Sequence, residues 1–128
     1  MGLGWNVTFE NQTKQEIEVV KIDYKNWYPN DLDGRFKLGA GQKTTKYTEI
    51  KSSVFSPLEI SYLIFLVQLH EGGKEVEIEL KGTNGDLNNG FKQIIDGDGF
   101  EIGMRGQTDL INFQASKDGQ VNLNLAFT

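Results

Sequence analysis

The chain offers few side chains whose type and spacing support catalysis. His70 is its only histidine and it has no cysteine, so a thiol nucleophile and a disulfide are both excluded. No serine lies in the G-x-S-x-G motif of an acyl-transfer nucleophile, and one histidine without a cysteine disfavours a zinc site. His70 ends an apolar run and precedes Glu71-Gly72-Gly73, a position typical of an exposed turn residue. We therefore expect no enzymatic activity.

Carboxylates are plentiful, and a glycosidase needs only two of them. Glu75, Glu77 and Glu79 alternate along one predicted strand, so they share a face and repel one another. We expect them to form a solvated stripe that discourages edge-to-edge aggregation. No pair of carboxylates is set in an apolar run, which leaves no candidate for a general acid.

Oxygen-bearing side chains cluster in two turns that have some character of a calcium loop. One turn is Asp96-Gly97-Asp98-Gly99, and the other contains Asn84, Asp86 and Asn88. Neither has the ligand offsets or the flanking helices of an EF-hand. We expect polar turns without a bound metal, although ligands from both would meet if the turns shared one end of the fold. Asn84, Asp86 and Asn88 remain candidates for binding a polar ligand.

The segment Asp23 to Asp31 is the strongest candidate for a binding surface. It places Tyr24, Trp27 and Tyr28 among Asn, Asp and Pro residues that favour exposure. Aromatic rings with a polar tip suit membrane interfaces and stacking against sugars. Trp27 can instead close the end of the hydrophobic core, and the sequence leaves these two interpretations open.

Charge and hydropathy argue against several partners. The net charge is −5 and the pI about 4.8, so the global field repels a phosphate backbone and we expect no nucleic acid. The longest apolar run, Tyr62 to Val67, is too short to cross a bilayer as a helix. Residues 1–6 lack the charged and apolar regions of a Sec signal, so we expect cytoplasmic accumulation or non-classical release. No motif indicates a cofactor.

Hydrophobic residues recur with a period of two, which predicts strands. In Glu75 to Lys81 apolar and charged residues alternate, as in a strand with one wet face. Between Glu16 and Tyr24 the phase slips at Val19 and Val20, which predicts a β-bulge there. Leu58 to Leu69 is apolar on both faces, and its β-favouring residues predict a central strand rather than a buried helix.

Turns divide the strands at short intervals. Gly72-Gly73 and Asp118-Gly119 have the composition of hairpin turns. Two longer loops remain, Lys25 to Gly34 and Gly82 to Gly90. The 128 residues make one ordinary domain. Eight to ten short, mostly antiparallel strands in one domain predict an all-β fold, either a β-sandwich or a flattened barrel, and we favour the sandwich.

The order of these features is similar to that of the aegerolysins, and to the small component of a two-component insecticidal crystal toxin from Bacillus that shares their fold. The matching segments, in chain order, are Val7 to Thr13, Trp27-Tyr28-Pro29, Tyr47-Thr48-Glu49, Ile60 to Tyr62, and Glu77 to Leu80 with the loop after it. The resemblance implies an aegerolysin- or actinoporin-like β-sandwich without enzymatic activity. It also implies binding to membrane lipids, often with a larger protein partner that completes a pore.

We therefore expect a non-enzymatic protein that binds a membrane lipid or a cell-surface receptor, as a pore-forming or insecticidal toxin component acting with a partner protein. Aromatic side chains of the loops would enter the interface without electrostatic attraction, because the chain is acidic. Two alternatives stay open. One is a carbohydrate-binding lectin that uses Trp27, Tyr28 and the Asn/Asp loops, and the other is an acidic inhibitor or immunity-type protein that neutralises a basic partner.

Overall fold

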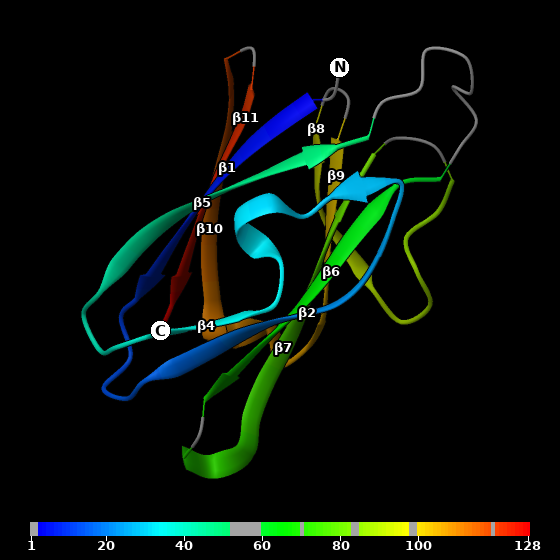
Figure 1. The fold of residues 1–128 in the computed structure, drawn as a ribbon. Coiled ribbons are helices and arrows are strands. Elements are labelled where there is room, and N and C mark those ends of the chain that lie inside the picture. The colour runs from blue at the N-terminus through cyan, green and yellow to red at the C-terminus, as the bar shows by residue number, and fades with distance from the viewer. Residues whose placement is uncertain (1–2, 52–59, 70, 83–84, 98–99, 119) are drawn as a thin grey trace.

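Two β-sheets packed face to face account for the regular structure of this protein. The computed structural model describes residues 3–51, 60–69, 71–82, 85–97, 100–118 and 120–128. These residues form eleven strands and three short 3-10 segments, and among them there is no helix long and apolar enough to cross a bilayer. Figure 1 shows the two layers side by side, which confirms the predicted all-β sandwich.

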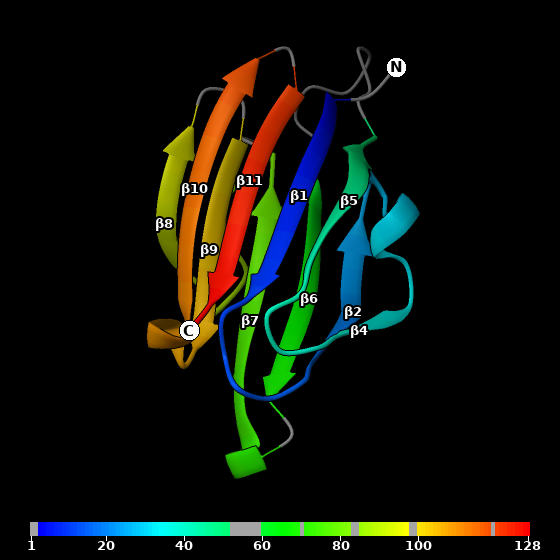
Figure 2. The same cartoon turned by 90° about the vertical axis from the view of Figure 1, so that its left-hand side faces the viewer.

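The first sheet, called sheet A, has five strands in the order β10-β11-β1-β5-β3. Their bounds are Ile111–Asp118 for β10, Gln120–Phe127 for β11, Leu3–Asn11 for β1, Lys43–Ile50 for β5 and Trp27–Tyr28 for β3. β1 pairs in parallel with β11 and antiparallel with β5. The first and last strands of the chain are therefore neighbours in the middle of sheet A, as Figure 2 shows.

The second sheet, called sheet B, has six antiparallel strands in the order β4-β2-β6-β7-β9-β8. Their bounds are Arg35–Leu38 for β4, Ile17–Lys25 for β2, Tyr62–Leu69 for β6, Lys74–Lys81 for β7, Phe100–Gly106 for β9 and Lys92–Gly97 for β8. The predicted central strand is confirmed over the bounds of β6. The hairpins predicted at Gly72-Gly73 and Asp118-Gly119 are confirmed by the antiparallel pairs β6–β7 and β10–β11.

The hydrophobic core lies between the sheets and is made by the inward half of each alternating strand. Apolar side chains on β1, β6, β7, β9 and β11 have almost no exposed surface, as the alternation predicts. Phe9 of β1 is the aromatic centre. Its ring centroid lies 5.6 Å from that of Phe65 on the opposite sheet, 5.3 Å from Phe36 and 6.2 Å from Phe127. This cluster joins both sheets and both ends of the chain.

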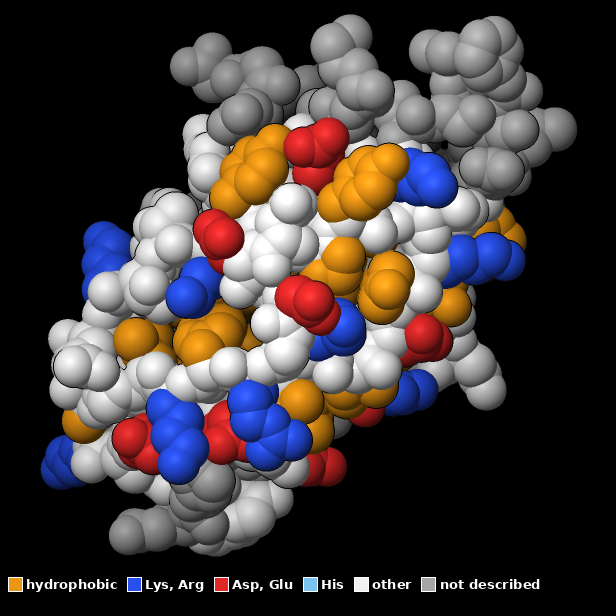
Figure 3. Space-filling model, viewed as in Figure 1, with side chains coloured by type: hydrophobic (Ala, Val, Ile, Leu, Met, Phe, Trp, Pro, Cys, Tyr) orange, Lys and Arg blue, Asp and Glu red, His pale blue; other side chains and the backbone are white. Residues whose placement is uncertain are grey.

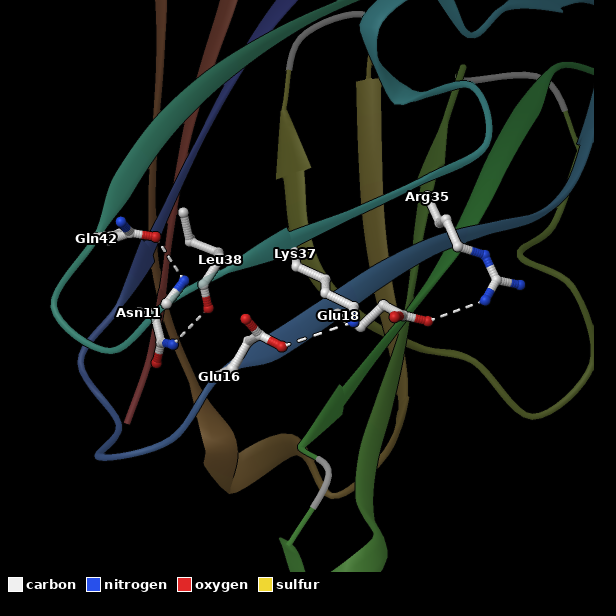
Figure 4. A network of polar contacts seen from close by, with 8 residues as sticks. Asn11, Glu16, Glu18, Arg35, Lys37, Leu38 and Gln42 are labelled. Atoms are coloured by element: carbon white, nitrogen blue, oxygen red, sulfur yellow. Dashed lines mark hydrogen bonds and ion pairs between the residues drawn. The ribbon is translucent and has the colours of Figure 1, made fainter.

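Asn11 fixes the connection between β1 and β2 at one end of the sandwich. It is fully buried, and its Nδ2 donates to the carbonyls of Gln15 at 2.7 Å and Leu38 at 2.9 Å. Its Oδ1 accepts from the backbone N–H and the hydroxyl of Thr13. Figure 4 shows Asn11 between the turn that follows it and the end of β4. The side-chain amide of Asn11 therefore satisfies backbone groups in the turn after β1 and at the end of β4, which are far apart in sequence.

The β-bulge in β2 lies two to three residues later than the sequence predicts. The pairing of β2 with β6 shifts between Lys21 and Asp23, so Ile22 is the extra residue and its side chain is 46% exposed. The apolar phase slip at Val19 and Val20 does not mark this position. Lys21 lies opposite the buried Phe65, on the inward face of the sheet. A charged side chain is tolerated at this position because its ammonium pairs with Asp33.

Replacing Phe65 with alanine should destabilise the sandwich strongly. The ring is fully buried at the contact between the two sheets, and loss of a buried phenylalanine costs about 3–5 kcal/mol through lost transfer energy and the cavity left behind. Urea unfolding measures the change, with Ile22→Ala at the exposed bulge as the control. A cost below about 1 kcal/mol, the range of surface substitutions, would contradict the central position of β6.

Candidate functional site

The aromatic segment predicted as a binding surface is the point where the chain crosses from sheet B to sheet A. β2 ends at Lys25, and β3 begins at Trp27 in the other sheet. Between them Asn26 has a φ of 49°, a left-handed conformation that asparagine adopts more readily than most residues. Its Nδ2 donates to the carbonyl of Ile60 at 2.9 Å, and its carbonyl accepts from the N–H of Lys51 at 3.1 Å. The crossing is therefore held by backbone groups on both sides.

Trp27 belongs to the core, so its predicted role as an exposed binding residue is corrected. Its side chain is 3% exposed, and its ring centroid lies 5.6 Å from that of Trp5. The indole Nε1 donates to the hydroxyl of Thr48 at 2.8 Å, which satisfies its one polar atom. The next residue faces the other way, because successive side chains of a strand alternate. Of the two interpretations that the sequence left open, the structure selects the one in which Trp27 closes the core.

Four large hydrophobic side chains are exposed around this crossing. Tyr24 and Tyr28 are 46% and 47% exposed, and Ile22 and Ile60 are 46% and 41% exposed. They lie within four residues of Asn26 in sequence or, for Ile60, bond to it. We call these four side chains the apolar rim. Large exposed hydrophobic residues that gather in one region mark interaction sites more often than scattered ones do.

Lysines accompany both tyrosines of the apolar rim. The Lys21 ammonium lies 4.9 Å from the ring centroid of Tyr24, and the Lys51 ammonium lies 6.0 Å from that of Tyr28. Lys21 also pairs with Asp33, and its hydrogen bond holds the pKa of that carboxyl below its ordinary value. Figure 3 shows hydrophobic side chains on this face interleaved with both acidic and basic ones. The rim therefore has no strong local charge of either sign.

Residues 85–88 of the second predicted binding segment, the loop from Gly82 to Gly90, lie against the outer face of sheet B. The carboxylate of Glu79 accepts from the backbone N–H of Asn88 at 2.9 Å and from its Nδ2 at 3.1 Å. Asn88 thus positions the loop, and its role in binding a ligand stays a prediction. Asp86 is exposed, and Asn84 lies outside the described residues.

Two further contacts hold the same loop in place. The Lys81 ammonium is fully buried and donates to the carbonyls of Gly82 at 2.9 Å and Gly85 at 2.8 Å. The side chain of Leu87 covers Gly103 of β9, where a Cβ would come within 2.8 Å of it. Glycine at this position therefore lets the Leu87 side chain pack close against the sheet. The apolar Leu87 was the one signal in the sequence that this loop is not fully solvated.

The acidic stripe predicted on β7 is only partly solvated. Glu79 is fully buried under the loop, and Glu77 pairs with Arg105 of β9. Burial raises the pKa of Glu79 above its ordinary value, and the hydrogen bonds from Asn88 and the nearby Lys81 oppose this in part. The stripe is therefore largely neutralised by its own neighbours. This weakens the interpretation of the chain as an inhibitor that presents an acidic face.

The two acidic turns lie only partly within the residues that the structure describes, so the expectation that they bind no metal stays a prediction. No group of three or more His, Asp or Glu side chains is arranged among the described residues to hold an ion. His70, Asp98 and Gly99 fall outside the described residues. Comparison with protein-family models and with curated proteins finds no match for this chain. Its function therefore has to be inferred from its own geometry.

Replacing Trp27 with alanine should unfold the sandwich rather than weaken binding selectively. The change removes a large buried ring and leaves the Thr48 hydroxyl without its donor, at a cost of about 3–5 kcal/mol. Tyr28→Ala, one residue away and exposed, is the matched control and should stay within about 1 kcal/mol of the wild type. Chemical denaturation of both variants measures the difference. Equal effects would place Trp27 outside the core.

Replacing Glu79 with glutamine should remove a pH-dependent part of the stability. Burial raises the folded-state pKa of Glu79 above its ordinary 4.5, so the folded protein binds this proton more tightly than the unfolded chain does. The free energy of unfolding of the wild type should therefore fall as the pH rises from 4.5 through the raised pKa, and the variant should lack this component. Urea unfolding across that range tests it, with Glu75→Gln on exposed β7 surface as the control. Parallel profiles for wild type and Glu79→Gln would contradict it.

Proposed function

We propose that this chain is a non-enzymatic protein that attaches to a cell membrane, or to a receptor displayed on it, through the apolar rim. The observation that carries the proposal is that the four large hydrophobic residues with high exposure in the described chain all lie within four residues of Asn26 in sequence or, for Ile60, accept a hydrogen bond from it. Two of them are tyrosines, whose rings pair an apolar body with a polar tip and so suit the boundary between lipid and water.

The strength of such an attachment can be bounded from the exposed area. Full burial of a large hydrophobic side chain contributes about 1.5–3 kcal/mol. The four rim residues are each a little under half exposed, so each gains roughly half of that. Association itself costs several kcal/mol, and even a single myristoyl chain gives only marginal, reversible membrane binding. The rim alone therefore supports weak attachment that a second interaction must strengthen.

A partner protein would supply this second interaction. The resemblance to aegerolysins and to the small component of a two-component insecticidal toxin implies such a partner, and it also implies a β-sandwich, which this chain has. We therefore extend the proposal to a pore-forming or insecticidal toxin component that acts with a larger protein. In this scheme the sandwich recognises the target surface, and the partner inserts into it.

Electrostatic attraction has little part in this mechanism. The chain carries a net charge of −5, and the Lys21 ammonium beside Tyr24 is balanced by Asp33. Anionic lipids attract polybasic segments, which this surface lacks. Binding to vesicles should therefore depend weakly on salt and should not require an anionic headgroup.

Co-sedimentation with vesicles tests the rim. The double variant Tyr24→Ser, Tyr28→Ser should lose at least about tenfold in binding to phosphatidylcholine vesicles, with and without added phosphatidylserine, while its stability stays within about 1 kcal/mol of the wild type. Val20→Ser, on β2 but outside the rim, is the matched control and should bind as the wild type does. A stable double variant that pellets like the wild type, or a wild type that pellets with no vesicle and binds no cell, would overturn the proposal.

A further inference from the structure

Uncharged polar side chains cover much of the outer face of sheet A. Figure 2 looks onto this face, across β10, β11, β1 and β5. Eight neutral side chains point outward from these strands, and we call them the amide face: Asn6, Thr8, Thr45, Asn112, Gln114, Ser116, Asn122 and Asn124. The charged residues Glu10, Lys43 and Glu49 also point outward, at the ends of β1 and β5, and Lys43 pairs with Glu10 at 3.9 Å. The neutral side chains of the amide face therefore share this surface with charged residues at its margins.

Strand pairing arranges these side chains in rows across the sheet. Gln114 lies opposite Asn124, which lies opposite Thr8, and Thr8 lies opposite Thr45. Side chains of directly paired residues are about 4.5–5.5 Å apart, and residues two apart along a strand share a face. The amide face is therefore a flat grid in which hydrogen-bonding groups recur at short, fixed distances.

Much of the hydrogen-bonding capacity of this grid is unused within the described chain. The hydroxyls of Thr8 and Thr45 bond to each other at 2.9 Å. By contrast, the exposed side chains of Asn112, Gln114 and Asn124 bond to no other side chain or backbone group that the structure describes. Each primary amide has two donors and one acceptor oxygen. Three side-chain amides are thus available to a ligand that both donates and accepts hydrogen bonds.

The grid is hollowed around Ala126. This residue lies between Asn112 of β10 and Glu10 of β1, where a small side chain leaves a gap among larger ones. Two adjoining hollows of about 180 and 320 Å³ share Gln114, Asn124 and Ala126 in their linings. The larger reaches the lower end of the range of ordinary ligand sites, about 300–1,000 Å³. A ligand seated there would contact the unpaired amides directly.

An aromatic ring borders the other end of the grid. Tyr47 of β5 lies opposite Asn6 and covers Gly4, where a Cβ would come within 2.4 Å of the tyrosine hydroxyl. Gly4 thereby lets the ring lie close against the sheet. The hydroxyl donates to Glu49 at 3.0 Å, which fixes the orientation of the ring. A fixed, partly exposed ring beside a set of amides offers both stacking and hydrogen bonding.

We propose that the amide face binds a neutral oligosaccharide. Sugar hydroxyls donate and accept hydrogen bonds, as primary amides do, so the two surfaces match group for group. A phosphate or sulfate ligand would find no cation within the grid, since the one nearby lysine in the hollows, Lys43, is balanced by Glu10 at 3.9 Å. Lipid tails would leave the amides without partners, at a desolvation cost. This site is separate from the apolar rim and does not depend on it.

An array of immobilised oligosaccharides tests the site directly. It should carry neutral glucans, galactans, mannans and chitin fragments beside sulfated counterparts, and the wild type should be retained by neutral members and not by the sulfated ones. The double variant Gln114→Ala, Asn124→Ala should weaken binding about tenfold or more, because each lost hydrogen bond contributes roughly a fivefold change. Ala126→Leu should also abolish binding, since it fills the hollow while leaving every amide in place.

Matched controls separate this site from a general effect and from the apolar rim. Gln68→Ala, Gln93→Ala removes two amides from the outer face of sheet B and should leave retention unchanged. The amide-face variants should still pellet with vesicles as the wild type does. Absence of retention by every neutral oligosaccharide would overturn the proposal, as would retention that survives both amide-face variants. If the amide-face variants lost vesicle binding and no neutral oligosaccharide retained the wild type, the face would be assigned to lipid headgroups. That result would also overturn the proposal.

Discussion

The parallel pairing of β1 with β11 is the constraint on which the rest of the structure depends. It joins the two ends of the chain in the middle of sheet A, with seven consecutive residue pairs from Trp5–Val121 to Asn11–Phe127. The inward side chains of these strands form much of the sheet A side of the core, and the outward ones form half of the amide face. Since the partners are separated by almost the whole chain, loop closure makes this contact slow to form. Loss of either terminal strand would remove the core and the face together.

The crossing at Asn26 combines a buried anchor with exposed aromatic rings in one short segment. Trp27 turns inward and packs on Trp5, while Tyr28 turns outward next to it. The buried indole anchors the backbone, so the exposed tyrosines are held by the core without belonging to it. A surface held in this way loses little conformational freedom on binding, which lowers the entropic cost of association. The rim is therefore better suited to recognition than an unanchored loop of the same composition.

The buried pair of Glu79 and Lys81 solves a related problem on the opposite sheet. A loop that lies on a sheet must satisfy its backbone groups without water, and these two side chains bond to Asn88, Gly82 and Gly85. Burial destabilises the charged form of the Glu79 carboxylate, and this raises its pKa. Replacing it by apolar residues would leave the loop's polar groups unpaired. Thus Glu79, which the alternation in the sequence places on a solvated stripe, holds the loop together with Lys81.

The sequence by itself determined the fold class and most of the core, because the period of two in β7, β9 and β11 follows directly from the geometry of a strand. It also located the aromatic segment, but not which of its rings faces the core. Only the tertiary structure decided that Trp27 is buried, that Asn88 serves Glu79 and that the bulge lies at Ile22. It alone assembled the amide face from strands at opposite ends of the chain. The alternation of apolar and polar residues predicts which side chains share a face of one strand. Which strands lie beside it and which loop covers it depend on contacts between distant segments, and no local pattern encodes these contacts.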